Sequence, residues 1–330
     1  MKSQTFWRLS TAMLGMTSRG VAAVGYFIDD DSCTPAMRDA VGKVLDGTFD
    51  MIQAGIDNVG KADKNANGPE QKLIDNLFGV EPEGTNPALS IKSTIQSRLN
   101  SLIDLKTNKF TSKDQLTPGV KNNNVKVYCD ERRLKVRKAN PLQSFDTDVE
   151  EVTDTGDCVT NVAYAGQTQK SFAQLQICPK LMQLIITDSA QTTAGLQASF
   201  WDKMVTIFVT FTAKVFYQPI DRVQLADKVL LHELTHLNVG GKTDDVGGFF
   251  QAYGWKNCMK LGLVTTDKAT KGGQNNADSW ALYGSVSLLI KTQEKTVEAN
   301  TGNIVATTST KKRAIEAVKS VAGRWVKFVA

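Results

Sequence analysis

The chain contains only two histidines, and both lie in the segment Leu231-His-Glu-Leu-Thr-His-Leu237. Apolar residues at helical spacing predict a helix from about Val223 to Leu237. Four residues are just over one helical turn, so His232 and His236 project from one face of this helix and can bind the same metal ion. Glu233 lies beside them, where it can accept a proton from a water held by that metal. We favour this metal site over two ordinary helix histidines because the only histidines in the chain have ligand spacing.

The third metal ligand has to be a carboxylate. A catalytic zinc site usually takes three protein ligands, and Lys242 occupies the position of the third histidine in the longer H-E-x-x-H-x-x-G-x-x-H pattern. Asp244 and Asp245 follow His236 in a glycine-rich turn that can fold back under the helix end; the alternative is that they only form a solvated turn. The downstream glutamates are far from the helix in sequence: Glu294, Glu298 and Glu316. The residues alone favour an aspartate of this turn without choosing between the two.

Charge and hydropathy exclude two classes of partner. The 330-residue chain has a net charge of +5 and no dense block of basic residues, so we do not expect it to bind nucleic acid. No apolar stretch reaches the roughly eighteen residues that a membrane-spanning helix needs, so we expect no integral membrane segment.

The cysteines and the first residues both bear on the compartment. Five scattered cysteines without a C-x-x-C pair predict disulfide crosslinks and an oxidising environment, with one thiol left over; the alternative is a set of buried free thiols. Residues 1–24 form a candidate signal segment, with a basic start and an apolar stretch from Leu9 to Met16, although Arg19 interrupts it. We therefore expect the protein to be secreted.

The remaining pattern predicts an α+β domain over residues 25–300, followed by a basic amphipathic helix within residues 301–330 that docks with a solvated basic face. Helical periodicity covers 35–59, 91–102, 276–291 and 313–329, and strand-like runs cover 124–129, 173–177, 181–186 and 204–216.

Four segments resemble the fungal deuterolysin and peptidyl-Lys metalloendopeptidase family, the aspzincins. They are His232-Glu-Leu-Thr-His236, Thr243-Asp-Asp245, Tyr253-Gly254 and Asn276-Ala-Asp-Ser-Trp-Ala-Leu-Tyr283. The family carries H-E-x-x-H, then G-T-x-D-x-x-Y-G, then an N-A-D-S-Y-A-like helix start. The specific similarity covers about residues 231–283. It implies a zincin-like fold with N-terminal helices, a twisted mixed sheet, the H-E-x-x-H helix and a smaller helical C-terminal subdomain.

The resemblance also assigns residues. It implies that Asp245 is the third zinc ligand and that Asp278 orients a ligand imidazole, whereas the alternative for Asp278 is an ordinary residue at a helix N-terminus. The sequence departs from the family at the tyrosine, because Gly248 occupies the expected position and Tyr253 follows five residues later. Either the chain has an insertion and Tyr253 takes the catalytic role, or that role is lost.

Together these observations predict a secreted zinc metalloendopeptidase that binds one zinc ion per chain and hydrolyses protein or peptide substrates, with Glu233 as the general base. The substrate would lie extended along a sheet edge beside the helix. The alternative is a catalytically degenerate secreted protein of the same fold that binds protein or cell-surface partners, and the displaced tyrosine is its main support.

Overall fold

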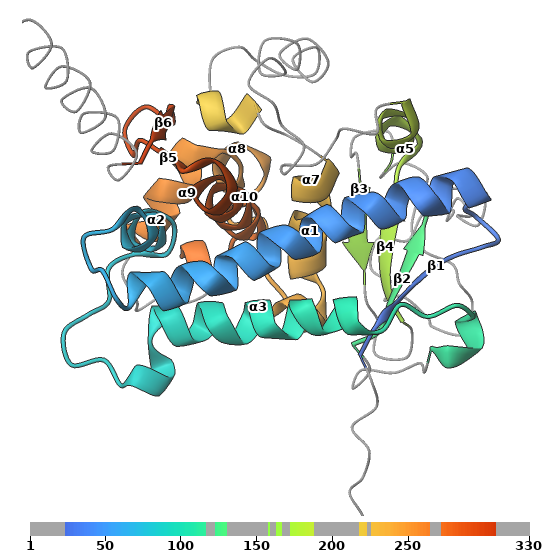
Figure 1. Ribbon diagram of the computed structural model, residues 1–330, viewed down its shortest axis with the longest axis horizontal. Coiled ribbons are helices and arrows are strands. Elements are labelled where there is room, and N and C mark those ends of the chain that lie inside the picture. Colours follow the sequence, from blue (N-terminus) through green and yellow to red (C-terminus); the bar gives the residue numbers. More distant parts are fainter. Residues whose placement is uncertain are drawn as a thin grey trace, which may run out of the picture.

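The computed structural model describes residues 24–116, 123–130, 158, 163–166, 172–187, 218–222, 226–264 and 272–307. Within those residues, eight α-helices and two small sheets form an α+β arrangement (Figure 1). The predicted α+β class is therefore confirmed. None of the described helices is both long and apolar enough to cross a membrane.

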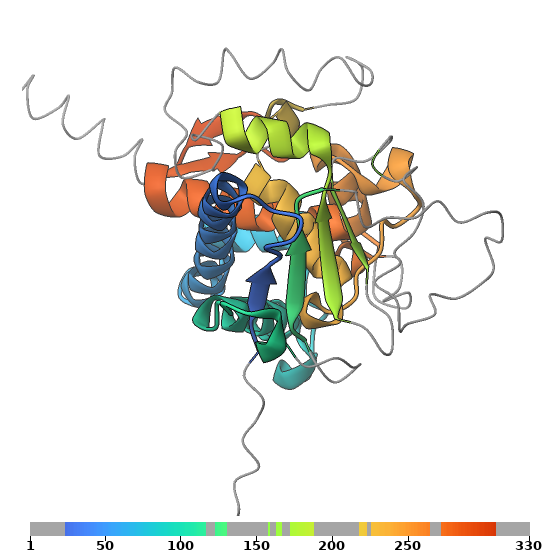
Figure 2. The same ribbon diagram turned by 90° about the vertical axis from the view of Figure 1, so that its right-hand side faces the viewer.

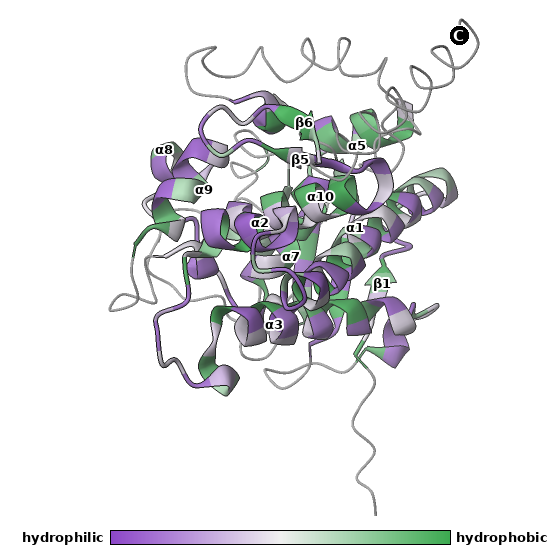
Figure 3. Cartoon of the chain, turned by 60° about the vertical axis from the view of Figure 1, so that its left-hand side comes forward, coloured by the Kyte–Doolittle hydropathy of each residue, from purple (hydrophilic) through white to green (hydrophobic). Residues whose placement is uncertain are grey.

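Two long helices, α1 (Pro35–Ala62) and α3 (Ile91–Thr107), run side by side (Figure 1). Each begins at a capping residue: the Thr34 side chain accepts a hydrogen bond from Met37 N, and that of Ser90 accepts one from Ser93 N. Hydrophilic and hydrophobic residues alternate along both helices, as expected when only one face is buried (Figure 3). Both helices were predicted from apolar periodicity, and the structure confirms them.

The main sheet has four strands in the order β1-β2-β4-β3. The strands β1, β2 and β4 are parallel, and β3 pairs antiparallel with β4 at the edge of the sheet as the described residues form it. Figure 2 shows the parallel strands side by side. A separate antiparallel pair, β5 and β6, follows the last described helix. The strands are β1 (Tyr26–Ile28), β2 (Val125–Tyr128), β3 (Ala163–Gly166), β4 (Ala173–Ile177), β5 (Lys295–Val297) and β6 (Ile304–Ala306). The predictions at 124–129 and 173–177 are confirmed.

The strand predicted at 181–186 is wrong, because this segment belongs to a helix, α5 (Pro179–Thr187). Leu181, Met182 and Ile185 are buried, which is the spacing of a helix face. Pro179 also suits the first position of a helix, and a short apolar run does not distinguish the two structures by itself. The predicted strand at 204–216, the C-terminal helix at 313–329 and residues 1–23 of the candidate signal segment lie outside the described residues. The strand β6 lies near the start of the predicted segment 301–330.

Two disulfides fasten the sheet at the ends of its parallel strands. Cys33, after β1, is bonded to Cys129, after β2, and Cys158 is bonded to Cys178, after β4. Cys258 is left as a buried free thiol. The prediction of disulfides with one cysteine left over is confirmed, and disulfides are typical of proteins from oxidising compartments.

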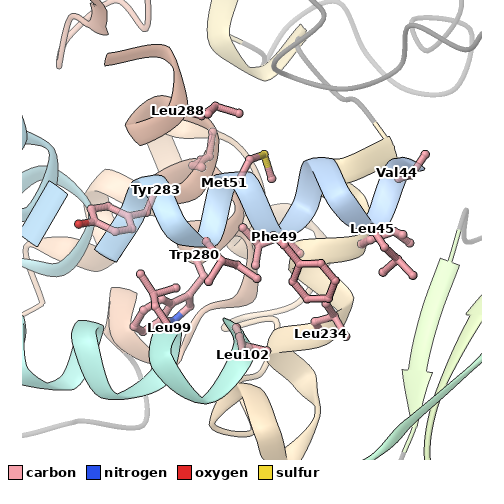
Figure 4. Packing of buried hydrophobic residues seen from close by; sticks show 14 of the residues in the cluster. Val44, Leu45, Phe49, Met51, Leu99, Leu102, Leu234, Trp280, Tyr283 and Leu288 are labelled. Carbon is pink, nitrogen blue, oxygen red and sulfur yellow. The ribbon is translucent and has the colours of Figure 1, made fainter. Parts of the chain in front are cut away.

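The hydrophobic core lies where α1 and α3 meet two buried helices, α7 (Ala226–His236) and α10 (Ala277–Gln293) (Figure 4). Phe49, Leu99 and Trp280 are fully buried there. Gly55 allows α1 to approach α3, because a Cβ atom at this position would lie 2.8 Å from Leu99 Cδ1. Two shorter helices, α2 (Pro69–Phe78) and α9 (Trp255–Gly262), pack against α10, and the short helix α8 (Phe249–Ala252) contacts α9.

We predict that Leu99→Ala destabilises the protein by about 2–5 kcal/mol, because it leaves a cavity between α1, α3 and α10. The matched control is Leu89→Ala: Leu89 is 76% exposed, so its loss should change the free energy of unfolding by less than about 0.5 kcal/mol. Chemical denaturation of both variants checks the prediction, and equal effects would contradict the packing described here.

Candidate metal centre

The helix α7 is almost entirely buried, because it packs against α1, α10 and the edge strand β3. It presents His232 and His236 from one face, as their four-residue spacing predicts. The helix ends at His236, and the chain then reverses through a short 3-10 turn, Asn238–Gly240. Thr243 N donates to Thr235 O at 3.0 Å, so the returning segment lies along the last turn of α7.

This reversal brings Asp245 to the two histidines. The Nε2 atoms of His232 and His236 lie 3.2 Å apart. Asp245 Oδ1 lies 3.4 Å from the first and 3.8 Å from the second. Asp244 is exposed, and its Oδ2 lies 3.5 Å from Asn275 Nδ2 instead. Of the two aspartates that the residues left open, the structure thus brings Asp245 into the cluster.

Both imidazoles turn the same nitrogen toward the cluster. His236 Nδ1 lies 2.8 Å from Thr243 O, and a carbonyl oxygen only accepts, so Nδ1 carries the proton and Nε2 keeps its lone pair. His232 Nδ1 lies 3.8 Å from Asp278 Oδ1 on the opposite side of its ring. A partner on the far nitrogen is the usual arrangement for metal-binding histidines.

These three residues fit a zinc ion. Zinc prefers nitrogen and carboxylate ligands at about 2.0–2.2 Å in tetrahedral geometry, which places ligand atoms roughly 3.3–3.6 Å apart. The separations of 3.2, 3.4 and 3.8 Å agree with that spacing to within a few tenths of an ångström. Asp245 Oδ1 is also buried without a hydrogen-bond partner among the described residues, which is costly unless a cation completes it.

The pKa shifts show how strongly the cluster attracts positive charge. Burial lowers the pKa of His232, but Asp245, Asp278 and the charge of Glu233 outweigh burial and raise that pKa to about 10. Burial raises the pKa of Asp245, but His232 and the Tyr253 hydroxyl hold it below its usual range. Burial is the main reason why the pKa of His236 is lowered. The centre is therefore a partly buried cluster in which carboxylates favour the positively charged form of His232.

Glu233 is buried beside the cluster and faces β3. Burial, together with the charge of Asp245, raises the pKa of Glu233 to about 7, while His232 and a hydrogen bond from the Ala165 backbone N–H oppose the shift. A carboxylate with a pKa near neutrality can take up and release a proton during a reaction.

Tyr253 reaches the cluster despite its unusual position in the sequence. Its hydroxyl donates to Asp245 Oδ2 at 2.8 Å and lies 3.5 Å from His232 Nε2. Its ring stacks on that of His232, with centroids 5.2 Å apart and an interplanar angle of 21°. The short helix α8 takes up the additional residues between Asp245 and Tyr253. Burial and the negative charge of Asp245 raise the pKa of Tyr253, so its hydroxyl keeps its proton.

Asp278 lies in the first turn of α10, and its Oδ1 atom lies 3.8 Å from His232 Nδ1. Its Oδ2 accepts the Gly254 N–H at 2.7 Å. Burial raises its pKa, but Lys228, His232 and this backbone N–H outweigh burial and hold the pKa well below its usual range. Asp278 is therefore a buried anion that joins α7, α10 and the segment after Tyr253.

Sequence reasoning missed three residues around the cluster. Lys228 Nζ lies 3.6 Å from Asp278 Oδ1, and Asp221 is a second buried carboxylate nearby. Asn276 holds both ends of the loop between Asp245 and Tyr253: its Oδ1 accepts from Val246 N at 3.1 Å and its Nδ2 donates to Ala252 O at 2.7 Å. Two of them left a signal: Lys228 precedes His232 by four residues on the same helix, and Asn276 begins the segment Asn276–Tyr283 that resembles the family, although no role was assigned to it.

We compared the chain with known proteins, and no family model, no curated protein and no solved structure matches it.

We predict that Asp245→Ala abolishes stoichiometric zinc binding, because two imidazoles hold the ion weakly. Asp244→Ala is the matched control: it removes an exposed carboxylate from the adjacent position and should keep one zinc ion per chain. Elemental analysis after zinc loading and desalting measures both. Loss of zinc from the Asp244 variant alone would show that Asp244, and not Asp245, is the third ligand.

Proposed function

We propose that this protein is a secreted zinc metalloendopeptidase with a zincin-like fold, of the kind found in the aspzincins. The observation that carries the proposal is the convergence of His232, His236 and Asp245 on one point, with Glu233 and Tyr253 beside it. These groups come from α7 and from the loop that returns past its end. They comprise a zinc ligand set, a carboxyl group with a pKa near 7 and a phenol that stays protonated.

His232, His236 and Asp245 would hold the metal. When bound, zinc supplies a Lewis acid and lowers the pKa of a coordinated water. Glu233 is buried, so its carboxylate accepts the proton of the attacking water without competing bulk solvent, and then passes that proton to the leaving amine.

Tyr253 and β3 would act on the substrate. The Tyr253 hydroxyl can move its hydrogen bond from Asp245 to the carbonyl oxygen that gains negative charge during attack. The strand β3 pairs with β4 on one side, and no other strand of the described residues pairs with its far side. An extended peptide can pair with the other side as an added strand. Because the Ala165 N–H of β3 contacts Glu233, a peptide placed there would lie beside the general base.

The position of Tyr253 weakens the alternative that the protein is a catalytically degenerate binding protein. That alternative depended on the displaced tyrosine, and Tyr253 lies within 2.8 Å of Asp245 Oδ2. A protein that only bound partners would have no physical need to bury Glu233 next to the three ligands.

We predict that Glu233→Gln keeps one zinc ion per chain and lowers peptide hydrolysis by about 10²–10⁴-fold, because it removes the proton acceptor but keeps the side-chain shape. The matched control is Glu83→Gln, at an exposed glutamate, which should cleave at the parent rate. Cleavage of an unfolded protein substrate, followed by mass spectrometry, measures both. A fully active Glu233 variant would contradict the hydrolytic mechanism, and a parent that binds zinc but cleaves nothing would favour the binding protein.

We also predict that Tyr253→Phe keeps its zinc and loses about 10²–10³-fold in kcat, the usual effect of removing one donor to a developing oxyanion. Tyr283→Phe is the control, because its hydroxyl donates to Gly55 O in the core. That variant should lose stability but retain kcat. Equal kcat values for parent and Tyr253→Phe would exclude the proposed role of the phenol.

A further inference from the structure

Two buried carboxylates hold the backbone directly after Tyr253. Gly254 N donates to Asp278 Oδ2 at 2.7 Å, and Trp255 N donates to Asp221 Oδ1 at 2.6 Å. These N–H groups open α9, where a helix leaves its first amides without partners and carries partial positive charge. Each amide therefore has its own anion, and the two anions come from segments far apart in the chain.

This arrangement lies directly after Tyr253 in the chain. Gly254 has a φ of +86°, and a Cβ atom there would lie 3.1 Å from Asp221 Oδ2. The chain thus makes a glycine-dependent turn against the carboxylates immediately after Tyr253. The tyrosine itself stacks on His232 and donates to Asp245. If the carboxylates released Gly254 and Trp255, the backbone that supports the hydroxyl at the metal centre would be free to move.

Two carboxylates buried near each other need a positive charge. Asp221 and Asp278 are 2% and 5% exposed, and an uncompensated buried charge costs several kcal/mol. Burial raises the pKa of Asp221 to about 6, while the charge of Lys228 opposes that shift and Asp278 adds to it. Lys228 is itself 4% exposed, and its Nζ lies 3.6 Å from Asp278 Oδ1.

Lys228 also lies on the helix that carries the ligands. It precedes His232 by one turn of α7, so both side chains emerge from the same face, and both lie close to Asp278 Oδ1, at 3.6 Å from Lys228 Nζ and 3.8 Å from His232 Nδ1. A metal-bound histidine is neutral. When His232 is neutral, Lys228 still places a positive charge beside the two carboxylates, 3.6 Å from Asp278 Oδ1.

We propose that Lys228 is a positioning residue, which balances the buried Asp221–Asp278 pair so that these carboxylates hold Gly254 and Trp255 and thereby keep Tyr253 at the metal centre. The proposal rests on the proposed metallopeptidase function for its catalytic consequence, but its structural part is independent of activity.

The structural part is tested by amide hydrogen exchange in Lys228→Met, which keeps the length of the side chain and removes its charge. Exchange at Gly254 and Trp255 should accelerate about tenfold or more through local opening, while amides of α3 keep the parent rate. Lys256→Met, at an exposed lysine of α9, is the matched control and should change neither. Adding Asp221→Asn to Lys228→Met removes one negative charge with the positive one, so protection at Gly254 should largely return.

The catalytic part is tested by a double-mutant cycle. Lys228→Met should lower kcat about tenfold when Tyr253 is present and less than twofold in the Tyr253→Phe background, because coupled residues act non-additively. Equal losses in both backgrounds, or unchanged exchange at Gly254, would overturn the proposal. If Lys228→Met does not fold, the variant with Asp221→Asn must fold, and its failure would also overturn it. If the parent cleaves no substrate, the proposed function fails, and the exchange data alone decide the role of Lys228.

Discussion

The burial of α7 is the constraint on which the rest of the structure depends. This helix packs between α1, α10 and the edge strand, yet it carries Lys228, His232, Glu233 and Thr235 at buried positions. Buried polar groups are costly unless each finds a partner. Each neighbouring segment that supplies such a partner is thereby held against α7. One example is the hydrogen bond that the Thr243 hydroxyl donates to the Thr235 hydroxyl. The hydrophobic core and the His232–His236–Asp245 cluster therefore both depend on α7.

Local sequence patterns could predict the helices and the paired histidines, but not which of two adjacent aspartates lies beside these histidines. The spacing of apolar residues in α1, α3 and α10 follows from which residues are buried, so these helices could be predicted from the sequence. The apolar segment at 181–186 was ambiguous because it is too short for its period to be read, and α5 resolves it. Asp244 and Asp245 have the same chemistry, so only the path of the chain after His236 decides which of them faces the imidazoles.

The partners of Asp278 could not be predicted, for a different reason. Residues 221, 228, 254 and 278 meet only after four separate segments have packed together. Each contact is between groups that are ordinary in their own local sequence: a lysine in a helix, an aspartate after a proline, a glycine before a tryptophan. The contacts among the charged side chains therefore depend on the fold and not on local sequence. The position of Tyr253 was hard to assign for the same reason, because its spacing from Asp245 in the sequence does not show how close the two side chains lie.

The side chain of Asn276 fixes both ends of the loop between Asp245 and Tyr253, so the geometry of these ends does not depend on the length of the loop. Because this amide clips Val246 on one side and Ala252 on the other, the intervening residues close a loop whose endpoints are already set. The entropy of such a closure depends only weakly on length. Residues 250 and 251 are exposed, so substitutions at these two positions leave the contacts of Asn276 in place, whereas Gly247 and Gly248 have positive φ angles that favour glycine.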